Sequence, residues 1–434
     1  MKFFKKPIFV FISPNAQWDD VWLALKLLFS PWKWVKGKAV KDFTEEFKKY
    51  VGVKYAFAFD SGRTSLYAVL KALDLKQGDE VLIQAFTCTA AVNPILWVGA
   101  KPVYVDIEEC TYNMSPDDLL RKINPGKSRA IIIQHTFGIP ANMDEIMEIA
   151  RKNNLLIIED VAHALGAEYS PFEALAKEGK GQKLGTFGDA AIWSFGRFKI
   201  ISAVFAGAAT TNNPQIAGKL EKFHKECSYP SYFWIFQQLF HPILLAKAKP
   251  LYNIWSLGKI FVVLAKKLKL ISLTVYPEEK SGGHPGFGPS KMPNALAILG
   301  LNQLRKIEKF NNHRRKLAEI YHREFGLINE AKLAKPIPGS KPAYLYFPVQ
   351  LENSELADEL LDAGKKQGIY LEIWPGRQAI GPEGTDLERL QYQIGSCPVA
   401  EETALKVVVL PTSPNTREKD ARRVAKLIKE NVGN

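Results

Sequence analysis

The chain has 434 residues and a formal net charge of +13, from 58 lysines and arginines against 45 aspartates and glutamates. Its hydrophobic fraction of 47% and charged fraction of 24% are typical of a soluble globular protein and argue against disorder. The length predicts at least two domains, because a single hydrophobic core stops growing well below it. The positive charge suits a phosphorylated ligand or an acidic lipid surface. Because no zinc-finger spacing, RNP signature or long basic run accompanies it, we expect no nucleic acid.

The four cysteines, Cys88, Cys110, Cys227 and Cys397, lie far apart and form no C-x-x-C pair. This spacing argues against a disulfide framework or a structural zinc site and predicts a cytoplasmic protein without a metal centre. The first residues, MKFFKKPIFVFISPN, contain an apolar run too short for a signal peptide. We therefore expect residues 1–37 to form a folded amino-terminal arm.

Short apolar runs alternate with amphipathic stretches from about residue 40 to 212, which indicates βαβ units around a mainly parallel sheet. Most of these runs are rich in Val, Ile and Ala without alternation, so both faces of the sheet should be buried. We assign this larger α/β domain to residues 38–227. Helices are expected at Thr64–Leu73 and Met143–Lys152. The seven expected strands are Tyr55–Asp60, Glu80–Gln84, Pro102–Ile107, Ala130–His135, Leu155–Asp160, Ala190–Phe195 and Gly207–Thr211.

The last third of the chain contains a long amphipathic pattern followed by a second alternating region. The Leu and Ile spacing over Met292–Phe325 predicts one long helix within a linking segment, residues 285–334. The segment AKPIPGSKP then marks a boundary near residue 335, because proline and glycine interrupt regular structure. Residues 335–434 alternate strand and helix again and are expected to form a smaller carboxyl-terminal α/β domain.

The motif SGRTSL follows the first strand and opens a helix. Gly62 allows a ligand to approach the backbone closely, and the amides of Arg63 and Thr64 at the helix start suit a phosphate group. A Ser-Gly pair between a strand and a helix is more often only a turn. The motif therefore indicates a phosphate site only in combination with the other motifs of the chain.

The motif IIEDVAHALGA places Asp160 at the end of a buried apolar strand. A carboxylate buried there needs a cationic partner, and a protonated pyridine nitrogen is one such partner. The alternative is that Asp160 caps the following helix. His163 is a candidate for contact with the phenolic oxygen of a cofactor, although a lone histidine more often serves packing.

The motif GTFGDAAIWSFGRFK brings Ser194 and Lys199 to the end of another strand. The Ser194 hydroxyl suits a phosphate, and desolvation would favour the neutral, nucleophilic amine of Lys199. Most lysines lie on the surface, but apolar strands enclose this one. A lysine amine, a carboxylate and a phosphate cradle together are what pyridoxal 5'-phosphate (PLP) requires. We therefore expect PLP to be bound through an imine with Lys199.

These motifs resemble the DegT/DnrJ/EryC1/StrS family of sugar aminotransferases, which belong to the fold-type-I class of PLP enzymes. The resemblance rests on SGRTSLYAVLKAL, GDEVLIQAFTCTAAVNPILWVGAKPVYVDIEECTYNMSPDDL, IIIQHTFGIPANMDEIMEIA, LLIIEDVAHALGAEY, KLGTFGDAAIWSFGRFK and KMPNALAILGLNQL, in the family's order. It implies a large domain with a mainly parallel seven-stranded sheet and a smaller carboxyl-terminal domain. It also implies a homodimer with active sites at the subunit interface, and transfer of an amino group from glutamate to a keto group of a nucleotide-linked deoxysugar.

The resemblance assigns roles by position. Lys199 falls on the imine-forming lysine and Asp160 on the carboxylate that pairs with the pyridine nitrogen. His163 falls where the family has Gln or His. Where the family stacks an aromatic residue on the ring, this chain has Cys88, so either Cys88 packs there or Phe86 or a residue from elsewhere substitutes. The phosphate-binding positions of the family correspond to Gly62, Arg63 and Ser194.

Residues 228–284 form an insertion that is longer and more apolar than the family's connection at this point. Over residues 228–280, lysines and prolines interrupt every run of about 20 apolar residues, which argues against a transmembrane helix. Aromatic residues with interleaved lysines are typical of helices that lie in a membrane interface, so we expect peripheral membrane contact. Extra subunit contact or lid packing is the alternative.

Two other functions compete with transamination. A PLP-dependent sugar dehydratase shares the fold, but that branch of the family replaces the lysine with histidine, and this chain keeps Lys199. A catalytically silent PLP-fold protein that serves as a membrane-associated binding or regulatory module is the alternative from a different class.

Overall fold

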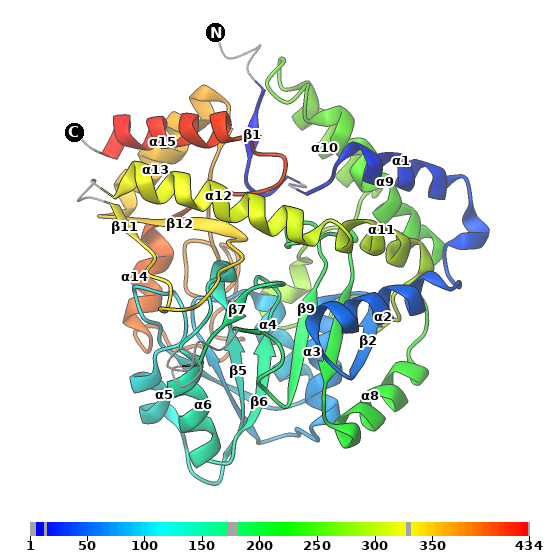
Figure 1. Cartoon of the computed structure of the whole chain (residues 1–434), viewed down its shortest axis with the longest axis vertical. Helices are drawn as coiled ribbons and strands as arrows, with labels where there is room; N and C mark the ends of the chain where they lie inside the picture. The colour runs from blue at the N-terminus through cyan, green and yellow to red at the C-terminus, as the bar shows by residue number, and fades with distance from the viewer. Residues whose placement is uncertain (1–5, 13–14, 172–180, 327–330, 433–434) are drawn as a thin grey trace.

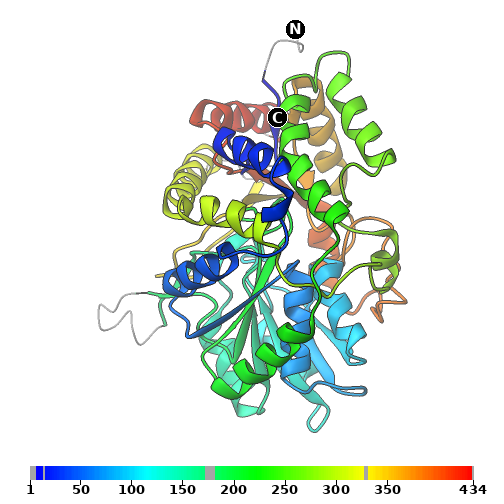
Figure 2. The same cartoon turned by 90° about the vertical axis from the view of Figure 1, so that its right-hand side faces the viewer.

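The computed structural model describes residues 6–12, 15–171, 181–326 and 331–432. A large sheet with its helices fills the lower half of Figure 1, and a smaller sheet with its helices lies above it. Helices flank the large sheet on both faces, as the turned view in Figure 2 shows. Residues 1–5 and 13–14 of the predicted amino-terminal arm lie outside the described residues.

The large sheet has seven strands in the order β2-β10-β9-β6-β5-β3-β4. Only β10 runs antiparallel to its neighbours; the other pairs are parallel. All residues of β3 and β10 are buried, which confirms the expectation from their unbroken apolar or small-residue runs. Every predicted strand is present, with its ends within two residues of the prediction. The strands are β2 (Tyr55–Phe59), β3 (Glu80–Gln84), β4 (Lys101–Val105), β5 (Ser128–Gln134), β6 (Leu156–Asp160), β9 (Ala190–Ser194) and β10 (Gly207–Thr211).

The helices of the large sheet follow ordinary amphipathic rules. In α6 (Met143–Lys152), Met143, Ile146, Met147 and Ala150 repeat with helical spacing and are buried. Acidic residues occupy its first turn and basic residues its last, which matches the helix dipole. The other helices and short 3-10 turns here are α2 (Ala39–Val51), α3 (Gly62–Ala72), α4 (Thr89–Trp97), α5 (Pro116–Lys122), η2 (Thr136–Gly138) and α8 (Pro214–Glu226).

The smaller sheet has four antiparallel strands in the order β11-β12-β15-β14. Its first strand, β11 (Ala331–Leu333), precedes the predicted boundary at residue 335. The amino-terminal arm reaches this half of the molecule, because β1 (Ile8–Phe9) pairs in parallel with β13 (Ile369–Tyr370). The remaining elements are β12 (Tyr346–Leu351), α13 (Ser354–Gln367), β14 (Glu372–Ile373), α14 (Pro398–Lys406), β15 (Val407–Pro411) and α15 (Glu418–Val432), together with the hairpin of β7 (Glu168–Tyr169) and β8 (Gln182–Lys183).

The single long helix predicted over Met292–Phe325 is wrong. The structure has two helices there, α11 (Asn294–Leu304) and α12 (Ile307–Phe325), with a turn at Arg305 and Lys306 between them. Lys306 pairs at this turn with Asp19 and Asp20 of α1 (Trp18–Leu28). The hydrophobic spacing continues through the turn, and no proline or glycine marks it, so the periodicity alone could not reveal it.

The insertion forms α9 (Tyr232–Ala248), α10 (Leu257–Lys267) and the 3-10 turn η3 (Pro277–Ser281). In Figure 2, α9 lies between α1 and α10, and α10 stands at the outer edge of the molecule. A short 3-10 turn, η1 (Pro31–Lys33), joins α1 to α2. In the described part of the chain, no helix combines the length and apolarity needed to cross a bilayer.

Candidate active site

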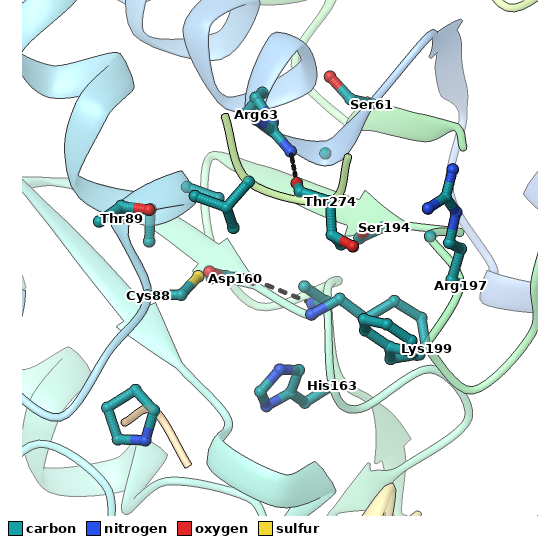
Figure 3. Close-up of a pocket in the computed structure, with 18 of the residues that line it drawn as sticks. Ser61, Arg63, Cys88, Thr89, Asp160, His163, Ser194, Arg197, Lys199 and Thr274 are labelled. Atoms are coloured by element: carbon teal, nitrogen blue, oxygen red, sulfur yellow. Dashed lines mark hydrogen bonds between the residues drawn. The ribbon is translucent and has the colours of Figure 1, made fainter. Parts of the chain in front are cut away.

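A cavity of about 310 Å³ opens at the carboxyl end of the large sheet, where the strands β6 and β9 end. Thr64 lies behind the cavity wall, where its hydroxyl accepts a hydrogen bond from Ser61 Oγ at 3.0 Å. The other predicted site residues line the cavity: Gly62, Arg63, Cys88, Asp160, His163, Ser194 and Lys199. All of these except Gly62 are labelled in Figure 3.

Lys199 sits on a tight loop after β9 and is enclosed within the cavity. Burial lowers the pKa of its amine, and Cys88 and Asp160 partly oppose this shift. The loop is held from the amino-terminal arm, because Asn15 Nδ2 donates hydrogen bonds to the carbonyls of Lys199 and Ile200. Asn15 Oδ1 in turn accepts a hydrogen bond from buried Arg314 at 2.6 Å. No sequence pattern predicted these hydrogen bonds of Asn15, because they join segments that lie far apart in the chain.

Asp160 and Glu159 end the same strand, but they face opposite sides because side chains alternate along a strand. Glu159 accepts hydrogen bonds from the amides of Gly185, Phe187 and Gly188 and so holds a neighbouring loop. Asp160 faces the cavity, where burial raises the pKa of its carboxyl group. One carboxylate is therefore structural, and the other is available to a ligand in the cavity.

His163 is buried beside the cavity, and its Nδ1 accepts a hydrogen bond from the amide of Phe137 at 3.4 Å. Burial lowers the pKa of the imidazole well below its usual value, and the positive charge of Lys199 adds to this effect. A neutral imidazole that accepts at Nδ1 carries its proton on Nε2. His163 is therefore a hydrogen-bond donor at neutral pH and not a cation.

The start of α3 forms a cradle against β9. Ser61 caps the helix by accepting a hydrogen bond from the amide of Thr64 at 3.2 Å. A Cβ atom at Gly62 would lie 2.9 Å from the Cβ of Ser194, and one at Gly207 would lie 2.5 Å from the amide nitrogen of Gly62. Glycine is required at both positions because a Cβ atom would collide with Ser194 in one case and with the backbone of the helix start in the other. Backbone amides at a helix start next to a serine hydroxyl fit a phosphate group.

The insertion contributes to the site in a way that the sequence did not predict. The guanidinium group of Arg63 forms a buried ion pair with Glu279 and donates to the carbonyl of Thr274 at 2.8 Å. The guanidinium group of Arg197 donates to the carbonyl and hydroxyl of Ser272. Thr274 also lines the cavity together with its neighbour Val275. Residues 272–279 therefore form a wall of the site and hold two arginine side chains.

Cys88 lines the cavity, as predicted, at the start of α4. Phe86 lies instead in an aromatic cluster, where its ring packs edge to face against Trp374 at 5.3 Å. Trp374 also lines the cavity and lies 5.0 Å from the ring of His163. Arg377 and Tyr392, two other residues of the smaller domain, do not line this cavity: Arg377 pairs with Asp358, and Tyr392 donates to Glu401 at 2.6 Å.

Replacing Glu279 with glutamine is expected to destabilise the protein by roughly 3–5 kcal/mol, because it leaves the buried guanidinium group of Arg63 without a counterion. Urea unfolding of the purified variant measures this loss. Glu278→Gln is the matched control, since Glu278 is the exposed neighbour. Equal unfolding midpoints for the two variants would show that the ion pair contributes nothing.

The amine of Lys199, the carboxylate of Asp160 and the phosphate cradle lie around one cavity and fit PLP. A lysine and a buried aspartate that line one cavity at the carboxyl end of a mainly parallel sheet define a PLP-dependent enzyme of the aminotransferase type. The model of the DegT/DnrJ/EryC1/StrS aminotransferase family matches residues 22–237 and 263–429, and the chain belongs to this family. It is therefore an aminotransferase, and its cofactor is PLP.

Characterised relatives span nearly the whole chain. GDP-perosamine synthase of Escherichia coli O157:H7 is 26% identical over 410 residues, which cover 93% of each chain. UDP-N-acetyl-3-dehydro-alpha-D-glucosamine 3-aminotransferase of Acidithiobacillus ferrooxidans is 26% identical over 418 residues, 95% of this chain and 94% of that protein. The crystal structure of an aminotransferase from Psychrobacter cryohalolentis superposes with a TM-score of 0.72 at 22% identity, covering 97% of this chain and 99% of the other.

Proposed function

We propose that this enzyme transfers an amino group from glutamate to a keto group of a nucleotide-linked sugar. The observation that carries the proposal is the pair of Lys199 and Asp160, whose side chains line one cavity beside a phosphate cradle. Support for the substrate class comes from the relatives, whose names specify sugars linked to GDP and UDP. The retained lysine argues against the dehydratase alternative.

Each residue has a defined task in this proposal. When bound, PLP supplies an aldehyde that links to amines and a ring that withdraws electrons. Lys199 would hold the cofactor through Nζ and, when displaced by the amino donor, move the proton that leaves its α-carbon. Asp160 would keep the ring nitrogen protonated. The amides of Gly62 and Arg63, with the hydroxyl of Ser194, would bind the phosphate, and Cys88 would pack beside the ring.

His163 and the cavity wall complete the arrangement. The neutral imidazole would donate its Nε2 proton in a hydrogen bond to the cofactor's phenolic oxygen, because its lowered pKa prevents a second protonation. Trp374 and residues 272–279 would exclude water from the proton transfer. We further propose a homodimer, and peripheral contact with a membrane through the insertion, whose exposed apolar side chains support this contact.

A panel of acceptors tests the substrate proposal. Glutamate alone is expected to convert the visible absorbance of the bound cofactor to that of its amine form in a single half-reaction. A GDP-, UDP- or dTDP-linked keto sugar is then expected to restore the original absorbance, whereas the same sugar without a nucleotide should do so poorly. Rapid restoration by simple 2-keto acids, with no response to any nucleotide-linked sugar, would contradict the proposal.

A further inference from the structure

Helix α10 carries its apolar side chains on the outside of the molecule. Only Gly258 and Ala265 of this helix are buried. Figure 2 shows the helix at the outer edge, next to α9. The exposed apolar residues on and around it, which we name the α10 surface, are Trp255 (79% exposed), Leu257, Ile260, Phe261, Val263, Leu264 and Leu268 (66% exposed). Single exposed apolar residues are ordinary on a soluble protein, but a contiguous apolar patch marks an interaction site.

The charges that the insertion itself places around the α10 surface have one sign. Residues 228–277 contain no aspartate or glutamate. Four lysines lie on α10 or directly after it, and all are exposed: Lys259, Lys266, Lys267 and Lys269. An apolar surface that carries these ammonium groups is complementary to a partner that is apolar inside and anionic at its boundary. Acidic phospholipid headgroups over acyl chains have this composition.

A second copy of the chain is a poorer fit to the same surface. A two-fold interface buries the same patch of both subunits against itself. The lysines of one α10 would then face the lysines of the other, with no carboxylate in residues 228–277 to compensate them. A lipid surface avoids this repulsion, because each ammonium group can reach a phosphate while the helix buries its apolar side chains.

The aromatic residue and the length of the helix favour the same partner. Trp255 precedes the helix, and tryptophan rings favour the boundary between headgroups and acyl chains. The 11 residues of α10 are too few to cross a bilayer but are enough to lie in its surface. We propose that residues 255–269 dock on anionic phospholipid. The proposal rests on the peripheral membrane contact proposed above and names its surface and its lipid class.

Vesicle sedimentation tests this docking with the full-length enzyme. The wild type is expected to sediment with vesicles of phosphatidylcholine and phosphatidylglycerol, and to stay in solution with phosphatidylcholine alone. The variant Lys266→Gln/Lys267→Gln/Lys269→Gln should bind the anionic vesicles about a hundredfold more weakly, from a contribution of roughly fivefold per lysine. Replacing apolar residues, as in Phe261→Glu/Leu264→Glu, should abolish sedimentation. Controls of the same chemistry elsewhere on the surface are Lys76→Gln/Lys222→Gln/Lys366→Gln and Leu120→Glu/Ile394→Glu.

A second measurement does not depend on how the glutamate variants fold. Brominated phospholipids quench tryptophan fluorescence at short range, and the quenching is expected to fall in Trp255→Phe. Transamination by the α10 variants in the absence of vesicles should match the wild type, so a failure of docking is distinguishable from a failure of the proposed reaction. Wild-type enzyme that ignores both vesicle types would overturn the docking. The docking would also be overturned if the wild type bound no lipid and the glutamate variants no longer dimerised. That result would show that a second copy of the chain covers the α10 surface.

Discussion

Lys199→Ala is expected to lower the rate of transamination by at least about a thousandfold, because it removes both the amine that holds the cofactor and the group that moves the proton. Burial already lowers the pKa of this amine, which favours loss of its proton. The measurements are single-turnover kinetics with glutamate and the visible absorbance of the bound cofactor. Both signals should be lost together.

Two companion variants separate chemistry from packing. Lys199→Met keeps the volume of the side chain without its amine, and it should be as inactive as Lys199→Ala. It should unfold at the same or a higher urea concentration, since it has no ammonium group to desolvate. Added methylamine should restore part of the activity of Lys199→Ala by supplying the missing amine. A Lys199→Ala enzyme with near-normal turnover would remove Lys199 from the proposed mechanism.

Asp160→Asn is expected to lower the rate by two to four powers of ten, because the loss of a buried charge partner costs roughly 3–5 kcal/mol and each tenfold change in rate corresponds to about 1.4 kcal/mol. The variant keeps the shape of the side chain but cannot hold the ring nitrogen in its protonated form. The measurement is kcat with saturating glutamate. Full activity in this variant would contradict the assigned role.

The stability of the cofactor-free protein should respond to Asp160→Asn in the opposite direction. Burial raises the folded-state pKa of this carboxyl, so its ionised form destabilises the fold above that pKa. The loss of stability begins as pH rises above the pKa of an unfolded aspartate and is complete above the folded-state pKa. It is absent in more acidic solution, where the carboxyl group is protonated in both states. At about pH 7 the asparagine variant should therefore be at least as stable as the wild type in urea, and the difference should vanish near pH 3. Glu159→Gln is the matched control and should lose stability, because Glu159 holds three backbone amides.

The strands were predictable because their signal is local. Runs such as EVLIQ and GAATT carry their burial in their own composition, and the structure places them within two residues of the prediction. The turn at Arg305 and Lys306 was not predictable, since it depends on contact with Asp19 and Asp20, which lie almost 300 positions earlier. Hydrophobic spacing reports which face of a helix is buried and not where a distant partner interrupts it.

The candidate site divides in the same way. Gly62, Asp160, His163, Ser194 and Lys199 are read from motifs at the ends of strands, because the carboxyl ends of parallel strands converge on one edge of the sheet. The sequence patterns missed Asn15 and Glu279, because each reaches the cavity or its supporting loop from another part of the chain. No local pattern distinguishes these residues from ordinary surface or core residues.

The sequence by itself determined the sheet, the lysine and the carboxylate, because periodicity and motif order are properties of neighbouring residues. Only the tertiary structure showed that the adjacent carboxylate of Glu159 holds a neighbouring loop, and which residues support Lys199. The tertiary structure also showed that the insertion lines the site with Thr274 and exposes α10 at the edge of the molecule. Burial and ion pairing depend on segments brought together from distant parts of the chain, and these contacts exist only after folding.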